Sequence, residues 1–382
     1  MSGRNLRILF LSMFLWVFGF GLYDDLFAIH ARALGATGVQ LGLLFTTRQL
    51  IITAGSILGG VLSDRYSRRA VMLVSWVLGA PAPLLFLAAR EWIWLLPGIV
   101  LYDLTIFGLP ALNAYITERT DPTKIASTFA ILTTASALSL LLSPALGGLI
   151  AARWNIRTTF ALAFLCYAAS TILMFWSAPD RPGGRPALSW REALRIWDLG
   201  SPWPLFILLG LMTGVPLALA PFVPPFLREV RHLGLAQIGL LGSILSAGGL
   251  IFTLASGRLA DRWGHRPLLV LTLLLIAAGN LIVALGPLAL LPLAFLIKSR
   301  SAAQSLSQAV VAARISMAAA GRGFGLLGTI TGLVAAGGTM LAGIAYRVDP
   351  ALPLIAGAGA VTLLAAALLA QRLAAATHHP RG

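Results

Sequence analysis

Six charged side chains interrupt long apolar stretches of this sequence, and they are the residues best placed to bind ions or polar ligands there: Asp24, Asp25, Arg48, Asp103, Lys298 and Arg300. On insertion scales a charge in the middle of a membrane costs roughly 2.5–3.5 kcal/mol, so a chain that keeps one is expected to use it. Three of the six are acidic and three are basic, so pairing among them would leave no net charge. We expect this set to include the groups that bind substrate or protons.

The adjacent carboxylates of Asp24 and Asp25 suggest a proton site. Like charges this close repel each other, and a proton held by one of them relieves the repulsion. Neighbouring residues of a helix lie about 100° apart, so one aspartate can face the interior while the other pairs with Arg48 or reaches the outer interface. We predict that at least one membrane aspartate, Asp103 included, takes part in proton coupling. The alternative is structural ion pairing within the N-terminal half.

A polar half-face is predicted for the apolar stretch 288–313. On a continuous helix, six of its residues fall within one half of the circumference: Lys298, Arg300, Ser301, Gln304, Ser305 and Gln308. We expect this half to line a water-filled cavity. Aromatic residues of the N-terminal half could supply the apolar part of the same cavity: Trp16, Phe18, Phe20, Tyr23, Phe107 and Tyr115.

The composition explains which elements position these residues. The chain is 58% hydrophobic and 11% charged, whereas soluble domains are about 45–50% apolar and about 25% charged. Its apolar runs are long enough to cross a bilayer as helices and do not alternate as barrel strands do. They predict an all-α membrane protein with twelve transmembrane helices, at residues 6–31, 38–62, 69–89, 92–116, 124–152, 158–178, 203–227, 235–260, 267–287, 288–313, 322–346 and 350–373.

The distribution of basic residues predicts the topology. The net charge of +15 comes from residues spaced between apolar runs, which argues against a nucleic-acid partner. With the N-terminus inside, 18 of the 28 Lys and Arg residues fall on the inner side and 7 on the outer side. This positive-inside bias places both termini in the cytoplasm. We expect a multi-pass protein of a prokaryotic inner membrane.

A short loop sequence occurs twice, as GVLSDRYSRR at residues 60–69 and as GRLADRWGHR at residues 257–266. Both copies fall in predicted cytoplasmic turns, and a long connection at residues 179–202 separates the two halves. The chain resembles the major facilitator superfamily over essentially its whole length, since the loop is similar to that family's signature G-x-L-x-D-R-x-G-R-R. The first copy departs from the signature by having Ser67 in place of glycine.

The resemblance implies two pseudo-symmetric six-helix bundles that alternate access to a central site. The predicted parts are an N-terminal bundle (1–178), a cytoplasmic linker with an amphipathic helix (179–202) and a C-terminal bundle (203–382). The loop residues are expected to act as a conformational latch: Gly60, Asp64, Arg65, Arg68, Arg69 and Glu118 in the first half, and Gly257, Asp261, Arg262 and Arg266 in the second. The glycines would let helices approach closely. The alternative is that these charges only set the topology.

Small residues predict where helices contact each other closely in lipid. One face of the span 235–260 carries Gly239, Gly242, Ser246, Gly249, Thr253 and Ser256, and the span 124–152 carries Ser136, Ser139, Ser143 and Gly147. By resemblance, these two helices meet between the halves. The stretch Ser143 to Gly148 is also similar to a degenerate form of the G-P-x-x-G-G motif of proton-coupled drug antiporters.

The repeat also relates charges inside the membrane. Asp64 and Asp261 of the two loops are 197 residues apart, and so are Asp103 and Arg300. The latter two therefore occupy equivalent positions of opposite halves and could form a lock between the halves or a substrate clamp.

These features favour a secondary transporter that moves a small organic solute by proton-coupled efflux. A second hypothesis is uptake of an organic anion bound by Arg48, Lys298 and Arg300. An intramembrane enzyme or a non-transporting sensor is a minor alternative, because the spans contain no metal-spaced His/Cys set or Ser/His pair. We expect no cofactor and no metal, a small molecule and protons as ligands, and a monomer in the bilayer.

Overall fold

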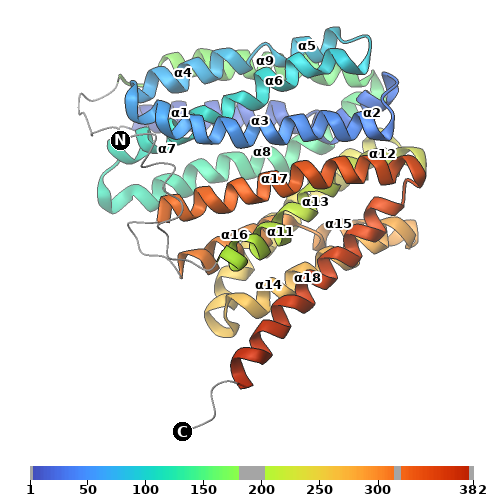
Figure 1. The fold of residues 1–382 in the computed structure, drawn as a ribbon. Helices are drawn as coiled ribbons and strands as arrows, with labels where there is room; N and C mark the ends of the chain where they lie inside the picture. The colour runs from blue at the N-terminus through green and yellow to red at the C-terminus, as the bar shows by residue number, and fades with distance from the viewer. Residues whose placement is uncertain (1–2, 180–202, 314–319, 378–382) are drawn as a thin grey trace. The chain divides into compact units, whose positions relative to one another are not determined.

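The computed structural model describes residues 3–179, 203–313 and 320–377, and for Asp64, 320–322 and 371–377 it describes the backbone alone. Every regular element in these ranges is a helix (Figure 1). The N-terminal helices are α1 (Gly3–Gly21), α2 (Asp24–Ala33), α3 (Gly38–Arg65), α4 (Arg68–Gly79), α5 (Ala82–Ala88), η1 (Trp92–Leu95), α6 (Leu96–Leu104), η2 (Thr105–Phe107), α7 (Gly108–Arg119), η3 (Pro122–Lys124), α8 (Ile125–Arg153) and α9 (Ile156–Phe175).

The C-terminal helices follow residues 180–202, so the predicted linker helix lies outside the described residues. They are α11 (Trp203–Leu219), η5 (Ala220–Phe222), α12 (Val223–Glu229), α13 (Leu235–Trp263), α14 (His265–Leu285), η6 (Leu288–Leu290), α15 (Leu291–Ile297), α16 (Arg300–Ala312), α17 (Ala320–Val348) and α18 (Leu352–Thr377). Eleven helical stretches of the described chain are long and apolar enough to cross a membrane, which accounts for every predicted span except 288–313.

The chain divides into two compact units. Unit 1 comprises Met1–Arg195 together with Leu227–Ser243, and unit 2 comprises Ile196–Phe226 together with Ile244–Gly382. In unit 1, α1 packs against both α8 and α9, and α4 packs against α7. In unit 2, α11 packs against α17, and α14 packs against α18. The bundle boundaries expected from the sequence stay a prediction.

Within unit 1, the segment Leu227–Ser243 contacts the N-terminal helices through specific interactions. The Arg32 guanidinium donates from Nε to Oε1 of Glu229 at 2.7 Å and from Nη2 to Oε2 at 3.2 Å. The backbone N–H of Ala145, next to Pro144 inside α8, donates to Oγ of Ser243 at 3.0 Å. A Cβ added to Gly148 would lie 2.9 Å from the Cα of Gly239, so the two backbones touch there.

Several predicted spans are interrupted, and the interruptions coincide with the membrane charges. The span 6–31 breaks between α1 and α2, which places Asp24 and Asp25 in the first turn of α2, where negative charge is favoured. Asp103 lies in the last turn of α6, directly before the 3-10 turn η2. Lys298 and Ser299 separate α15 from α16 because Ser299 is extended (φ −67°, ψ 129°). In transporters, interrupted helices provide polar backbone groups at membrane depth.

The break after α15 corrects the predicted polar half-face of residues 288–313. Residues Ser301, Gln304, Ser305 and Gln308 are exposed together on α16. Lys298 is buried, with 7% of its surface exposed, and its Nζ lies 4.1 Å from the centre of the Phe295 ring. It is therefore not part of that face, since the 100° rotation per residue does not continue through an extended residue.

Candidate functional site

Three of the predicted membrane charges meet in unit 1. The Arg48 guanidinium donates from Nη1 to Oδ1 of Asp24 at 2.9 Å and from Nε to Oδ1 of Asp103 at 3.2 Å. We call Asp24, Arg48 and Asp103 the triad. The Asp103 side chain is 4% exposed, that of Arg48 is 20% exposed and that of Asp24 is 37% exposed. The Arg48 guanidinium therefore joins a buried carboxylate, that of Asp103, to a more exposed one, that of Asp24.

Three different helices position the triad. Asp24 begins α2 after the break, Arg48 projects from the middle of α3, and Asp103 lies near the end of α6. The pairing of Asp24 with Arg48 was one of two outcomes that the sequence allowed. The pairing of Asp103 with Arg48 agrees with the alternative of ion pairing within the N-terminal half, although the sequence did not specify this partner, which depends on the packing of α3 against α6. The predicted pairing of Asp103 with Arg300 concerns both units and stays a prediction.

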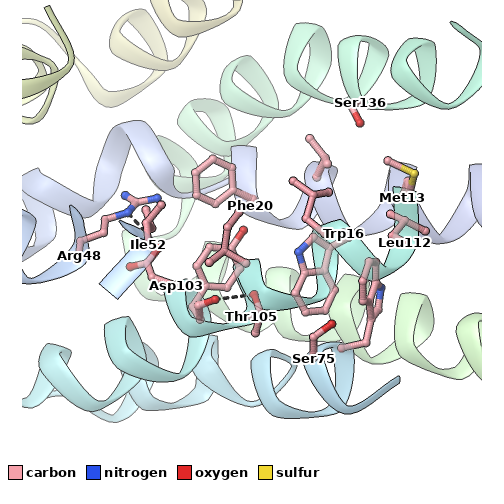
Figure 2. A pocket seen from close by; sticks show the side chains of 15 residues that line it. Met13, Trp16, Phe20, Arg48, Ile52, Ser75, Asp103, Thr105, Leu112 and Ser136 are labelled. Carbon is pink, nitrogen blue, oxygen red and sulfur yellow. Dashed lines mark hydrogen bonds and ion pairs between the residues drawn. The ribbon is translucent and has the colours of Figure 1, made fainter. Parts of the chain in front are cut away.

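The triad borders a cavity of about 340 Å³ whose lining is mainly apolar (Figure 2). Figure 2 shows Arg48 at one side of the view and Met13 and Leu112 at the opposite side, with Trp16 and Phe20 between them. Its lining residues are Met13, Trp16, Val17, Phe20, Arg48, Ile52, Ser75, Trp76, Tyr102, Asp103, Thr105, Ile106, Leu109, Leu112 and Ser136. All of them belong to unit 1.

Three aromatic rings that line this cavity, those of Trp16, Phe20 and Tyr102, take part in stacks of nearly parallel rings, together with Tyr167 behind them. Tyr102 stacks on Phe20 with centroids 5.6 Å apart and an angle of 4°, and on Tyr167 at 5.6 Å and 9°. Trp16 stacks on Tyr167 at 4.4 Å and 18°. Stacking of this kind is favourable beyond simple burial. A wall of parallel rings next to charged groups can accept a flat ligand that has both apolar and polar parts.

Only part of this aromatic wall was foreseen. Trp16 and Phe20 line the cavity as expected, whereas Phe107 and Tyr115 are buried in the core of unit 1. Tyr102 and Tyr167 were missed. A signal for Tyr102 exists in the sequence, because it immediately precedes Asp103. Within the described residues, no group of three or more His, Cys, Asp or Glu side chains is placed to hold a metal ion.

Comparison with known proteins decides the family. The family model of the Major Facilitator Superfamily matches residues 9–339 and also residues 205–381. The chain belongs to the Major Facilitator Superfamily. It is a transporter and an integral, multi-pass membrane protein, as the repeated loop and the apolar spans predicted.

Two curated relatives have names that describe their roles. The multidrug resistance protein MdtG of Klebsiella pneumoniae is 26% identical over 290 residues, covering 71% of this chain and 69% of that protein. The enterobactin exporter EntS of Citrobacter koseri is 28% identical over 302 residues, covering 75% of this chain and 70% of that protein. Among solved structures, a point mutant of the nucleoside transporter NupG matches with a TM-score of 0.84 at 14% identity, covering 96% of this chain and 99% of that one, which shows the shared fold.

In this superfamily member, Arg68 and Arg69 of the first signature copy contact the C-terminal ends of α7 and α9. Arg68 forms an ion pair with Glu118 and donates from Nη1 to the carbonyl of Ala114 at 3.3 Å. Arg69 donates from Nη2 to the carbonyl of Phe175 at 2.6 Å and from Nε to the carbonyl of Ser177 at 3.1 Å. Arg69 therefore holds the C-terminal end of α9, where a cation is favoured. Arg65 is exposed, and the side chain of Asp64 lies outside the described residues.

The two signature copies make their turns differently. Ser67 has φ −52° and ψ 121°, and its Oγ accepts from the N–H of Ala70 at 3.2 Å, so it caps α4. Gly264, at the equivalent position of the second copy, has φ 82° and ψ 157°, a conformation that L side chains rarely adopt. The serine that departs from the family pattern thus replaces a glycine turn with a side-chain cap. In the second copy Asp261 and Arg262 are exposed and Arg266 is half-buried.

Within each unit the two signature glycines have open space beside them, and their role in bringing helices close stays a prediction. A Cβ added to Gly60 or Gly257 would meet no described atom within 4 Å. On the span 124–152 the predicted small residues do pack closely, but against the first span: Ser139 donates to the carbonyl of Phe14 in α1 at 2.8 Å, and Gly147 packs on the backbone of Leu22. The contact of α8 with α13 uses Gly148 instead.

Proposed function

We propose that this transporter couples proton uptake by the triad to the export of small amphipathic organic molecules. The observation that carries the proposal is that Arg48 and Asp103 line an aromatic cavity in the same unit, with Asp24 joined to them through Arg48. A proton site and a substrate site that border each other can influence each other's occupancy.

The charges of the triad support a proton-binding role. Two carboxylates and one guanidinium carry a net charge of −1, and one added proton makes the group neutral. Since net charge inside a membrane is costly, the neutral form suits a state that is closed to water. The deprotonated form suits a state in which a bound ligand or water stabilises the remaining charge. The exposed side of Asp24 offers a way for the proton to reach Asp103.

Export is supported by the names of the two curated relatives, a multidrug resistance protein and an enterobactin exporter. The bias of 18 inner against 7 outer basic residues supports cytoplasmic termini in a prokaryotic inner membrane. Uptake of an organic anion is less well supported, because Arg48 is already bound to two carboxylates. We also propose that the signature loops act as the latch and that the transporter works as a monomer by alternating access, without enzymatic activity.

Transport into inside-out proteoliposomes under an imposed pH gradient tests the proposal. The probes are acridone, ethidium and naphthoate, which are a neutral, a cationic and an anionic aromatic compound. We expect an acidic lumen to drive uptake of acridone or ethidium and not of naphthoate. Asp103→Asn should abolish the response to the gradient, whereas Glu91→Gln, at an exposed surface position, should not change it. Naphthoate as the only transported probe, or full coupling in Asp103→Asn, would contradict the proposal.

A further inference from the structure

Phe20 lines the cavity beside Arg48 and Asp103 and contacts the guanidinium of the triad. Its ring stacks on Tyr102 at 5.6 Å and 4°, and the Cζ of Arg48 lies 5.4 Å from its centre. Its side chain also lines the cavity (Figure 2). The same ring therefore touches the surface available to a ligand and the guanidinium that joins the two carboxylates, and such a cation–ring contact is attractive.

The backbone on both sides of Phe20 is held in place. A Cβ added to Gly19 would lie 2.8 Å from the Tyr167 ring, and Gly21 packs directly on the side chain of Ser143. These contacts leave little room for α1 to move at this level. If Phe20 moves when a ligand binds, we therefore expect its side chain to rotate while its backbone stays in place.

The stack of Phe20 on Tyr102 is also the contact that a flat ligand would make. Two parallel rings at 5.6 Å between centroids form an offset stack. A planar ligand in the cavity could form the same stack on Tyr102, and it would then displace the ring of Phe20. Arg48 would then lose that ring as a neighbour and would be stabilised mainly by the two carboxylates that it already contacts.

From this arrangement we infer that Phe20 is the positioning residue that makes substrate and proton compete for this transporter. The inference rests on the function proposed above. In the proton-loaded state one carboxyl of the triad is protonated, and the ring of Phe20 supplies part of the stabilisation of the guanidinium. When a ligand displaces the ring, the guanidinium depends on the negative charge of both carboxylates, which it already contacts, and the proton leaves the carboxyl for water. No covalent bond other than that O–H bond changes.

Other titratable groups also surround the triad. The neighbouring titratable side chains are the phenols of Tyr23, Tyr102 and Tyr167, and Tyr23 and Tyr167 are joined by a hydrogen bond of 3.1 Å between their hydroxyl oxygens. Asp25 points instead towards Gly242 of α13. The ion partners of Arg48 are thus the two carboxylates of the triad.

Phe45 provides a matched control. Its ring lies 5.8 Å from Cζ of Arg48, nearly as close as that of Phe20. It packs edge-on against Phe27 at 5.9 Å and 86°, and it is outside the set of cavity-lining residues. Phe45 can therefore stabilise the guanidinium without sensing a ligand.

Binding of acridone to the full-length protein in nanodiscs, measured by fluorescence polarisation over a series of pH values, tests the inference. Acridone is uncharged throughout, so it does not compete with the proton by charge. We expect its Kd to rise as the pH falls, by up to about tenfold per pH unit if one proton is exchanged per ligand. In Phe20→Leu the Kd should become independent of pH. Phe45→Leu should keep the slope of the natural protein, and Phe20→Tyr should restore it.

The outcomes separate the inference from the function on which it rests. A slope in Phe20→Leu equal to that of the unaltered protein would overturn the role of Phe20 alone. If Phe20→Leu and Phe45→Leu both lose the pH dependence of the Kd equally, then ring contact with Arg48 is what matters and contact with the ligand is not required. That result would also overturn the role of Phe20. No binding of either acridone or ethidium to the unaltered protein, or binding without any pH dependence, would remove the proposed function as well. Phe20→Tyr keeps the test valid if Phe20→Leu does not fold.

Discussion

Asp24 and Asp25 are adjacent in the chain, yet their carboxylates have different surroundings. Asp24 accepts a hydrogen bond from Arg48 at 2.9 Å. The carboxylate of Asp25 instead packs against Gly242, so closely that a Cβ added to that glycine would collide with it. Both belong to the first turn of α2, and the rotation of about 100° per residue directs them to different neighbours. The structure therefore offers a pair of adjacent, chemically identical side chains for separating proton coupling from general effects of charge.

The first prediction compares Asp24→Asn with Asp25→Asn. Asp24→Asn removes one of the two carboxylates that Arg48 binds. We expect it to lower pH-driven transport about tenfold or more, the size of an ordinary coupling between two sites. Asp25→Asn leaves the triad intact and should retain most of the transport. Equal losses in the two variants, measured in proteoliposomes at matched protein content, would argue against the triad as the proton site.

The second prediction concerns the ion pair of Arg48 with Asp103. Arg48→Gln leaves two carboxylates without their shared cation, so we expect it to destabilise the protein by about 3 kcal/mol. Asp103→Asn leaves Arg48 with Asp24 and should cost about 1–2 kcal/mol. The double variant should cost less than the sum of the two, because each single change leaves an uncompensated group. Unfolding in detergent of the four proteins measures this coupling, and additive losses would contradict a direct interaction.

The sequence predicted the membrane class, the repeated signature and the charges that meet in the triad because these depend on composition and local pattern. It did not predict the breaks at Leu22–Tyr23 and at Lys298–Ser299, where the chain leaves the helix without a proline at the break. Helical periodicity was therefore extended too far, and Lys298 was placed on the wrong face. The partner of Asp103 could not be predicted either, since the repeat relates positions in the two halves and does not specify which helices touch.

The third prediction uses the two forms of the signature turn. Gly264 has φ 82°, so Gly264→Ala should strain the backbone and cost about 1–3 kcal/mol. Ser67 has a negative φ and caps α4, so Ser67→Ala should cost about 1 kcal/mol through loss of the cap and Ser67→Gly only a few tenths. Thermal unfolding of the three variants gives the order. A loss in Ser67→Gly as large as that in Gly264→Ala would mean that the two turns are not distinguished by these conformations.

The fourth prediction concerns the ion pair of Arg32 with Glu229, which joins the end of α2 to the end of α12. Their side chains are 30% and 32% exposed, so the pair is expected to contribute about 0.5–1 kcal/mol. Arg32→Glu and Glu229→Arg should each lower stability, since each places two like charges together, and the double exchange should restore most of it. High salt should reduce all three differences. Failure of the double exchange to recover stability would show that the pair does not attach residues 227–243 to unit 1.

The last prediction contrasts two glycines of the same helix, α13. A Cβ at Gly239 would lie 2.8 Å from the Cα of Gly148, which is backbone and cannot rotate away. Gly239→Ala should therefore push α13 from α8 and destabilise the protein by about 1–3 kcal/mol. A Cβ at Gly257 meets no described atom within 4 Å, so Gly257→Ala should be neutral or stabilising by about 0.5–1 kcal/mol through its higher helix propensity.

Because Gly257 begins the second signature copy, transport by Gly257→Ala separates two roles for that glycine. If Gly257→Ala is fully stable but transports poorly, the glycine is needed for a conformational change. If Gly257→Ala is fully stable and transports normally, this chain does not need a glycine at position 257.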